Sequence, residues 1–377
     1  MHPARGMPRR ALITGGAGFI GSHLADDLLA HGYRVRALDM LLPQVHGADR
    51  RRPSHLASEV ELIQGDIRDP LAVRRALAGI DVVCHLAARV GVGQSMYELS
   101  EYTAVNNLGT ATLLEALVEH PVERLIVASS MSIYGEGLYR DPAGRKHEHV
   151  LRTQEQLLRG IWEPRSPEGR PLVSVPTPET KAPAIASVYA LSKWDQEQLC
   201  LLTGAAYHIP TVALRCFNVY GPRQALSNPY TGVLAIFAAR LLSDNPPLVF
   251  EDGHQQRDFV HVRDVARACR LALEIPQAAG GVFNIGSGQA TTIAEVAERM
   301  AHVLGSDLEP HITYQYRVGD IRHCTADIAL ARRVLGYEPA IDLDEGLAEL
   351  AAWLASQRPI DREDAMRADL VERRLAL

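Results

Sequence analysis

Short, continuously apolar runs alternate with longer amphipathic stretches over the first 215 residues of the chain. Apolar runs of roughly four to eight residues between turn signals are typical of buried strands, and a period of three to four residues is typical of helices. We expect strands at Arg10–Thr14, Arg34–Leu38, Glu61–Gln64, Asp81–Leu86, Arg124–Ser129 and Thr211–Arg215. Helices are expected at Phe19–His31, Leu71–Ala78, Tyr102–Glu119 and Val188–Leu202.

Strands that are apolar along their whole length favour a parallel sheet covered by helices on both faces. The predicted fold class is therefore α/β, with a doubly wound parallel sheet of the Rossmann type in residues 8–217. A smaller, mixed C-terminal substrate domain is expected at 218–355, and the chain re-enters the first domain around 258–285. A charged tail, as a terminal helix or a frayed end, occupies 356–377. Helices in this second half are expected at Val233–Leu242, Val262–Leu273, Ile293–Leu304 and Ala329–Leu335.

The alternation stops at Gly135, and seven of the 22 prolines follow within about 50 residues. Long segments without regular structure are uncommon inside compact domains and usually serve as lids or other functional loops. We expect residues 136–186 to form an irregular insertion, with a lid as its preferred role.

Composition excludes several classes of protein. With 47% hydrophobic and 22% charged residues the chain is neither disordered nor fibrous. No apolar run approaches the ~18 residues of a membrane span, and Met1–Arg10 lacks the apolar core of a secretory signal. A net charge of −6 does not indicate binding to nucleic acid or to a membrane surface. Five widely spaced cysteines without a C-x-x-C pair predict free thiols and a cytoplasmic location.

A glycine-rich segment, Thr14–Gly21, lies between the first strand and the first helix. Gly15 allows a tight turn, Gly18 lets backbone N–H groups approach a pyrophosphate, and Gly21 allows close packing of the helix on the sheet. Asp39 ends the second strand, where a carboxylate binds the ribose hydroxyls of NAD and repels the 2′-phosphate of NADP. The alternative is a solvated carboxylate at a strand end. The pattern favours NAD.

Tyr189 and Lys193 are four residues apart and so share one face of a predicted helix. Random placement of 12 tyrosines and three lysines gives only about 0.1 such pairs, so the spacing is informative. An ammonium and the positive nicotinamide ring are expected to lower the pKa of the phenol from its usual ~10. Tyr189 then becomes a candidate general base for a hydroxyl proton. An ordinary surface contact is the alternative.

Further segments make the chain resemble the extended short-chain dehydrogenases/reductases, in particular their nucleotide-sugar epimerase and dehydratase group. The resemblance covers about Arg10 to Trp353. It implies that Phe19 and Ile20 line the cofactor with the glycines, that Gly65-Asp66-Ile67 lies along the adenine, and that Leu86-Ala87-Ala88 is the turn beside the cofactor. It also implies that Asn106 braces the site and that Ser130 supplies the third catalytic hydroxyl. The matching segments are His85–Ala88, Asn106–Thr110 and Ser129–Gly135.

The same resemblance implies a site for a nucleotide-diphosphate sugar. Asn218 aligns with a residue that touches the substrate phosphates, Arg257 and Arg317 align with arginines that clamp the diphosphate, and Phe250 aligns with an aromatic against the nucleobase. Guanidinium forks suit a diphosphate, although for each arginine alone a structural ion pair is an equally good interpretation. Ser95 is a candidate sugar contact, with a loop-capping role as the alternative.

Departures from the family pattern reduce the number of reactions that the resemblance allows. Met131 and Ser132 stand where 4,6-dehydratases carry an acidic pair, and no cysteine stands there as in 3,5-epimerases. What remains is NAD-dependent 4-epimerisation through a transient 4-keto sugar. Segments Pro43–Gly47 and Arg89–Met96 resemble enzymes that interconvert dTDP-L-rhamnose and dTDP-6-deoxy-L-talose. A UDP-hexose or UDP-uronate 4-epimerase, a 4-ketoreductase, a decarboxylase and a non-catalytic NAD-binding regulator are the alternatives.

Two expectations concern partners. In this family the helices at Tyr102–Glu119 and Val188–Leu202 pack between subunits, which implies a homodimer. The segment His147-Glu148-His149 contains residue types that bind metals. Alternating residues in an extended polar segment more often form a solvated surface than a metal site. We therefore assign no metal.

Overall fold

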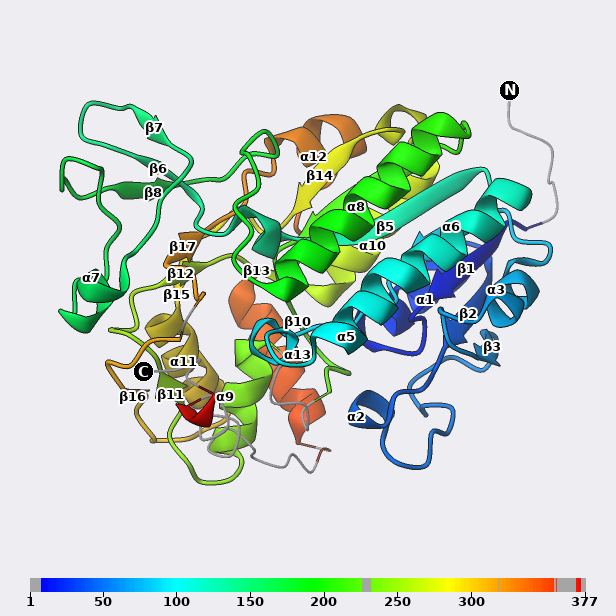
Figure 1. Cartoon of the computed structure of the whole chain (residues 1–377). Helices are drawn as coiled ribbons and strands as arrows, with labels where there is room; N and C mark the ends of the chain where they lie inside the picture. Colours follow the sequence, from blue (N-terminus) through cyan, green and yellow to red (C-terminus); the bar gives the residue numbers. More distant parts are fainter. Residues whose placement is uncertain (1–7, 226–231, 318, 356, 358–370, 374–377) are drawn as a thin grey trace.

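Seven parallel strands form the central sheet of the molecule (Figure 1). The computed structural model describes residues 8–225, 232–317, 319–355, 357 and 371–373. Strand order is β14-β9-β5-β4-β1-β2-β3, which confirms the predicted doubly wound sheet and all six predicted strands. The bounds are β1 Arg10–Thr14, β2 Arg34–Asp39, β3 Glu61–Gln64, β4 Val82–His85, β5 Arg124–Ser130, β9 Thr211–Cys216 and β14 Val282–Ile285.

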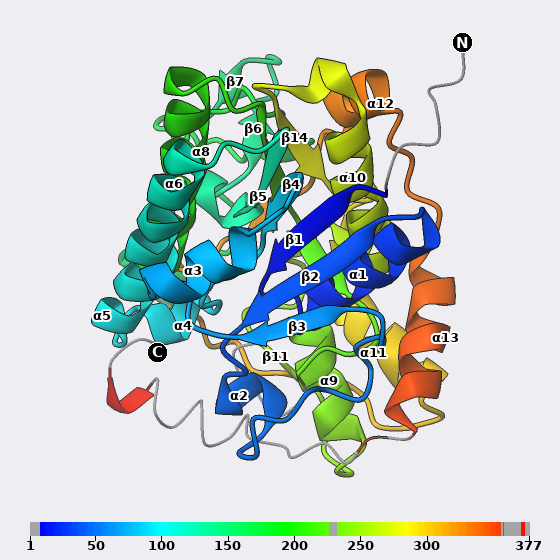
Figure 2. The ribbon, with the colours of Figure 1, turned by 90° about the vertical axis from the view of Figure 1, so that its right-hand side faces the viewer.

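Helices cover both faces of this sheet (Figure 2). On one face lie α3, α6 and α8, and on the other lie α1 and α10. In β1, Leu12 packs toward the first group while Ala11 and Ile13 pack toward the second, so this inner strand is buried on both faces. The edge strand β3 instead has exposed Glu61 and Gln64. The helices are α1 Phe19–Ala30, α3 Pro70–Leu77, α6 Gly109–Glu119, α8 Val188–Ala206 and α10 Val262–Glu274, with the short α2 Pro43–His46 and α12 Ala329–Leu335.

The helix expected at Tyr102–Glu119 is not a regular α-helix. It is built from α5 Leu99–Tyr102, a π-helical segment η1 Thr103–Leu108 and then α6, and the short α4 Val92–Ser95 precedes it. In a π-helix each N–H bonds to the fifth preceding carbonyl instead of the fourth. Apolar spacing does not distinguish the two forms, so the sequence predicted the position of this element but not its type.

A second lobe is formed mainly by residues after 218, with its own core around Phe237, Val296 and Leu350. Its helices are α9 Val233–Leu241, α11 Ile293–Val303 and α13 Leu343–Leu354, and the 3-10 turn η3 spans Pro276–Ala278. The small sheets pair β10 Asn218–Tyr220 with β13 Phe259–His261, β11 Leu248–Val249 with β16 His311–Ile312, and β12 Gln256–Arg257 with β15 Thr291–Thr292 and β17 His323–Cys324. We did not predict α13. Most of the tail at 356–377 lies outside the described residues.

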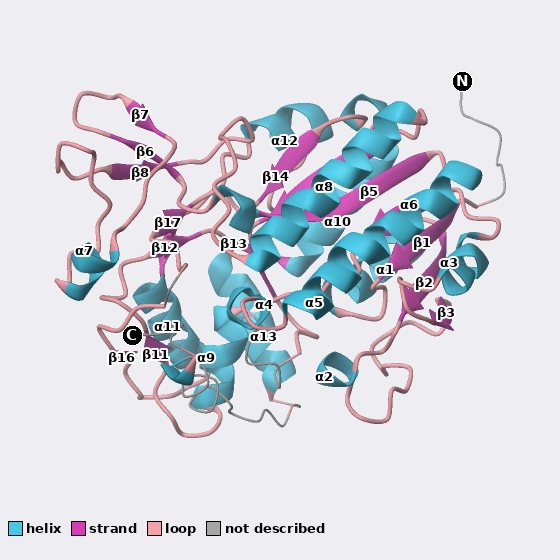
Figure 3. Cartoon of the chain, in the orientation of Figure 1, coloured by secondary structure: helices cyan, strands magenta, loops and turns pink. Residues whose placement is uncertain are grey.

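The insertion contains regular structure, contrary to the expectation of an irregular segment. It forms an antiparallel three-stranded sheet in the order β7-β6-β8, set apart from the main sheet (Figure 3). Tyr139, Val150 and Leu172 make a small core under it. The elements are β6 Leu138–Arg140, β7 Lys146–His147, α7 Gln154–Leu158 and β8 Val173–Val175. These strands have only two or three residues each, which is too short for a clear period in the sequence.

All five cysteines are buried and free, as predicted. Among the described helices, none combines the length and apolar character that crossing a membrane requires.

Candidate active site

A cavity of about 500 Å³ lies at the carboxyl ends of the central strands. Strand order reverses between β1 and β4, and ligands of open α/β sheets bind at such a reversal. The structure brings many of the predicted site residues together in its lining: Gly15, Gly18, Phe19, Ile20, Asp39, Ile67, Leu86, Ala87, Ala88, Ser130, Tyr189, Lys193 and Asn218.

The glycine loop has the geometry of a phosphate cradle. Gly15 has a φ of +71°, and a Cβ there would lie 3.0 Å from the backbone of Ala87. A Cβ on Gly21 would lie 2.3 Å from the Gly15 carbonyl oxygen, so only glycine lets α1 pack this closely. Gly18 is the N-cap of α1 and lines the cavity, which directs the positive end of the helix dipole toward it. This loop fits the pyrophosphate of a dinucleotide.

Asp39 lies at the end of β2 and is 8% exposed. Its Oδ2 accepts the N–H of Ala17 at 3.1 Å, and its Oδ1 accepts the N–H of Leu41 at 2.9 Å. The Nε2 of His46, on α2, is 3.6 Å from Oδ1. Burial lowers the pKa of His46 although the Asp39 carboxylate acts to raise it. His46 also lines the cavity, and sequence reasoning missed it.

Ser130 and Tyr189 come from different elements. Ser130 ends β5 and caps the 3-10 turn η2 Met131–Tyr134, and its Oγ accepts the Ser132 backbone N–H at 3.2 Å. Tyr189 lies in the first turn of α8, where its backbone N–H donates to Ser95 Oγ at 3.0 Å. Lys193 is one turn further along the same helix. The predicted helix spacing places Tyr189 and Lys193 on one side of α8, and the end of β5 brings Ser130 to the same cavity.

In the protein alone, the pKa of Tyr189 is raised above its usual value. Burial raises it, the hydrogen bond with Ser130 acts to lower it, and Cys216 acts to raise it further. Lys193 is not among the groups that shift it, so the protein alone does not lower this pKa. Burial lowers the pKa of Lys193 to about 8.

Lys193 is held by a buried network that the sequence did not reveal. Its Nζ donates to Gln196 Oε1 at 2.5 Å, and Gln196 Nε2 is 2.9 Å from His85 Nε2. Burial lowers the pKa of His85 to about 3, so this ring is neutral. The Gln196 Nε2 also donates to Thr110 Oγ1 at 2.9 Å, and His85 Nε2 lies 2.9 Å from the same oxygen. The other ring nitrogen of His85, Nδ1, lies 2.7 Å from Thr14 Oγ1. The i,i+3 spacing from Lys193 was the signal available for Gln196.

Asn106 and Ser95 are fully buried and support the site from behind. Asn106 accepts the Arg89 N–H at 2.7 Å and donates to Ser192 Oγ at 2.8 Å, which ties the loop after β4 to α8. Ser95 Oγ donates to the Val92 carbonyl at 2.6 Å. Neither side chain lines the cavity. Ser95 is therefore placed behind Tyr189 and not beside the space for a sugar.

Asp66 also lies outside the lining, although Gly65 and Ile67 belong to it. Its carboxylate pairs with Arg68 at 2.7 Å. Burial acts to raise the pKa of Asp66, and the hydrogen bonds from Arg68 outweigh it and lower the pKa.

Phe250, Arg257 and Arg317 lie together in the second lobe but not in the lining of this cavity. The Arg317 guanidinium lies 4.7 Å from the centre of the Phe250 ring and pairs with Asp320 at 2.8 Å. Arg257 donates to the Ile321 carbonyl at 2.6 Å and to the Arg322 carbonyl at 3.0 Å. Much of the donor capacity of Arg257 is thus used by the backbone.

The fold and this site define the class of protein. The sequence matches the model of the NAD dependent epimerase/dehydratase family over residues 11–157 and 163–286. The chain belongs to this family, it is an enzyme, and NAD is its cofactor.

Similar proteins cover almost the whole chain. A dTDP-L-rhamnose 4-epimerase of Burkholderia thailandensis is 36% identical over 94% of this chain and 97% of its own. A putative UDP-glucose 4-epimerase of Methanocaldococcus jannaschii is 32% identical over 91% of this chain and 97% of its own. The crystal structure of a UDP-glucuronic acid 4-epimerase from Bacillus cereus, in complex with UDP-glucuronic acid and NAD, superposes with a TM-score of 0.75 at 29% identity, covering 92% of this chain and 99% of that one.

The position of Asp39 predicts the cofactor preference. In the Asp39→Ala variant we expect the Kd for NAD to rise about tenfold or more, roughly 1.4 kcal/mol, while the Kd for NADP changes less, because the repulsion of a 2′-phosphate is also removed. Calorimetric titration of both cofactors measures the ratio of the two Kd values. Asp39→Asn is the control, since it removes the charge but keeps an oxygen acceptor. An unchanged ratio in both variants would show that the ribose is held elsewhere.

Proposed function

We propose that the protein catalyses the NAD-dependent 4-epimerisation of a nucleotide-diphosphate sugar, with dTDP-L-rhamnose and dTDP-6-deoxy-L-talose as the substrate pair. The observation that carries the proposal is the convergence of Ser130, Tyr189 and Lys193 on the cavity that holds the glycine loop and Asp39. The similarity to a dTDP-L-rhamnose 4-epimerase over nearly the full length of both chains supports this choice of sugar.

The chemistry assigned to the side chains is a reversible proton transfer. Tyr189 removes the proton of the sugar C4 hydroxyl, and Ser130 hydrogen-bonds the same oxygen. Lys193 provides a buried ammonium one helical turn from the phenol. The glycine loop and Asp39 would hold NAD, which would supply a hydride acceptor and donor for C4, with the 4-keto sugar rotating between the two transfers, and a positive ring that would lower the phenol pKa. Tyr189 then gives the proton back to the C4 oxygen of the new epimer.

The groups around the cavity argue against elimination of water. Asp39 is the only carboxylate among the described lining residues, and it lies at the cofactor-ribose end. Met131 and Ser132 line the cavity at the positions where dehydratases carry their acidic pair. The Ser132 hydroxyl donates to Ser130 Oγ at 2.9 Å, so it supports the catalytic hydroxyl.

A 3,5-epimerisation also lacks a suitable base. Cys216 lines the cavity, but it comes from β9 and not from the segment after Ser130. Burial raises the pKa of its thiol to about 12, so the thiolate is scarce at neutral pH.

The homodimer remains a proposal, supported by apolar residues on the outer surface of the helix pair. Leu191 and Leu202 of α8 and Leu99 and Leu108 of the adjoining α5–η1 segment are at least half exposed. Large exposed apolar residues that cluster on one face are typical of protein interfaces. We propose that two copies pack these helices together.

Replacing Tyr189 tests the proton transfer. Tyr189→Phe removes only the hydroxyl, and we expect the rate to fall by at least ~10²-fold while the Kd for NAD is retained. Tyr207→Phe is the matched control, since Tyr207 is exposed just beyond the end of the same helix. Steady-state rates and a cofactor titration measure the two effects. Activity of Tyr189→Phe close to that of the wild type would refute the assigned role.

A panel of dTDP-, UDP- and GDP-sugars, incubated with enzyme and NAD, tests the reaction and the substrate. We expect dTDP-L-rhamnose to equilibrate with its C4 epimer without net formation of NADH, as followed by NMR and by nicotinamide absorbance. If only a UDP-sugar is epimerised, the proposed dTDP-sugar substrate is wrong, although the reaction type stands. Stoichiometric use of NADH, release of carbon dioxide, or no turnover of any sugar would each contradict the 4-epimerase.

Sedimentation at micromolar concentration tests the subunit pairing. We expect a species of twice the 41.3 kDa chain mass, converted to monomer by the double change Leu108→Glu and Leu191→Glu, which places charges in the proposed interface. Leu151→Glu, at an 85% exposed position in the insertion, is the control and should stay dimeric. A wild-type protein that sediments only as the monomer would contradict the proposal.

A further inference from the structure

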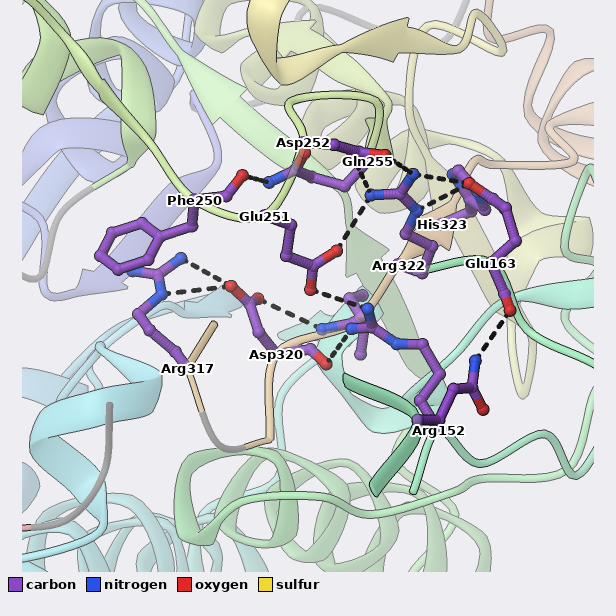
Figure 4. Close-up of polar contacts among 12 residues, drawn as sticks. Arg152, Glu163, Phe250, Glu251, Asp252, Gln255, Arg317, Asp320, Arg322 and His323 are labelled. Carbon is purple, nitrogen blue, oxygen red and sulfur yellow. Dashed lines mark hydrogen bonds and ion pairs between the residues drawn. The ribbon is translucent and has the colours of Figure 1, made fainter. Parts of the chain in front are cut away.

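The insertion is joined to the second lobe by buried charges (Figure 4). Its Arg152, whose side chain is 3% exposed, uses all three guanidinium nitrogens. Nε donates to Glu136 Oε1 at 3.1 Å, Nη1 donates to Glu251 Oε1 at 2.7 Å, and Nη2 donates to the Asp320 carbonyl at 3.0 Å. One side chain of the insertion thus contacts two separate segments of the second lobe.

Both segments belong to the cluster that carries the expected nucleotide contacts. Glu251 directly follows Phe250, and it has a φ of +52°, so this turn is held in a conformation that a non-glycine residue rarely adopts. Asp320 accepts the Arg317 Nη2 at 2.8 Å and the Arg257 Nη2 at 3.5 Å. Arg317 lies over the Phe250 ring. Arg152 therefore links the Glu251 carboxylate, next to Phe250, to the Asp320 carbonyl, in the residue that pairs with Arg317.

A second buried arginine reinforces the same turn. Arg322, 1% exposed, donates to Glu251 Oε2 at 2.9 Å and to Asp252 Oδ1 at 2.6 Å. It also pairs with Glu163 of the insertion at 2.6 Å. Glu251 is therefore held between two guanidinium groups. Removing one partner of such a buried network leaves an uncompensated charge, so the remaining groups must move or take up water.

The position of the insertion indicates that it supports the second lobe and does not cover the cavity. None of the described residues that line the cavity belongs to 136–186. The contacts of Arg152 and Glu163 instead lead to the turn at Phe250–Asp252 and to the segment at Asp320–His323.

We propose that Arg152 is a positioning residue for the nucleoside diphosphate of the substrate: through it, the insertion fixes the Phe250, Arg317 and Asp320 cluster that receives the nucleobase and the phosphates. The inference rests on the proposed function, in which the substrate is a nucleotide-diphosphate sugar, and on the expectation from the sequence that Phe250, Arg257 and Arg317 contact its nucleotide. Arg152 itself touches no ligand, so its loss affects nucleotide recognition and leaves cofactor binding intact.

Titration of dTDP and UDP into the NAD-loaded enzyme tests this role by calorimetry. In Arg152→Met we expect the Kd for the preferred nucleoside diphosphate to rise at least tenfold, with the Kd for NAD unchanged. Arg145→Met is the matched control in the same insertion, since the 62% exposed Arg145 side chain pairs with Asp141 inside the insertion and not with the second lobe, and its Kd values should equal those of the wild type. Arg152→Lys keeps the charge without the guanidinium fork, and a rise of about threefold or more is expected.

The outcomes separate the two proposals. Wild-type enzyme that binds neither nucleotide overturns the nucleotide site of the proposed function, and the role of Arg152 with it. Tight binding by the wild type and equal binding by Arg152→Met overturn the positioning role alone. Loss of both nucleotide and NAD binding in that variant indicates a general structural role and also overturns it. If Arg152→Met does not fold, Arg152→Lys decides: nucleotide affinity equal to the wild type rejects the proposal.

Discussion

A buried ammonium group, Lys193 Nζ, is the constraint on which the organisation of the site depends. A charge in this position needs an acceptor, and Gln196 supplies one at 2.5 Å. Gln196 in turn contacts Thr110 at 2.9 Å and His85, and His85 contacts Thr14. The chain of contacts joins α8, α6, β4 and β1, which carry or border the catalytic helix, the cofactor turn and the glycine loop. Satisfying one charge therefore fixes the elements that form the cavity relative to one another.

Much of the fold was predictable because the sheet is buried on both faces. The inner strands β1, β4, β5 and β9 are apolar over most of their length, and their boundaries are visible in the sequence. The missed elements differ in whether they carry such a signal. The strands of the insertion are too short for a period, and their small core at Tyr139 and Val150 forms only after residues distant in sequence meet. Helix α13 has apolar positions at Leu347, Leu350 and Leu354, a helical spacing that we overlooked.

The site could be predicted where its chemistry is local in sequence. Gly15, Asp39 and the Tyr189–Lys193 pair are recognised from neighbours within a few residues of each other or from their place at a strand end. Contacts between distant segments could not be predicted in this way, and Gln196 with His85 and Arg152 with Glu251 are examples. The effect of burial on the Tyr189 pKa could not be predicted from the sequence either, because it depends on how deeply the fold buries the phenol.

The π-helical segment Thr103–Leu108 limits how this part of the chain can change during evolution. It contains Asn106, and a π-helical turn accommodates one residue more than an α-helical turn. Deleting a single residue here would restore a regular α-helix and leave the flanking turns in nearly the same orientation, because the π-helical turn absorbs the additional residue. What would be lost is the bulge that holds Asn106 against Arg89 and Ser192. Exchange of neighbouring residues therefore preserves this brace, whereas loss of one residue removes the bulge that carries it.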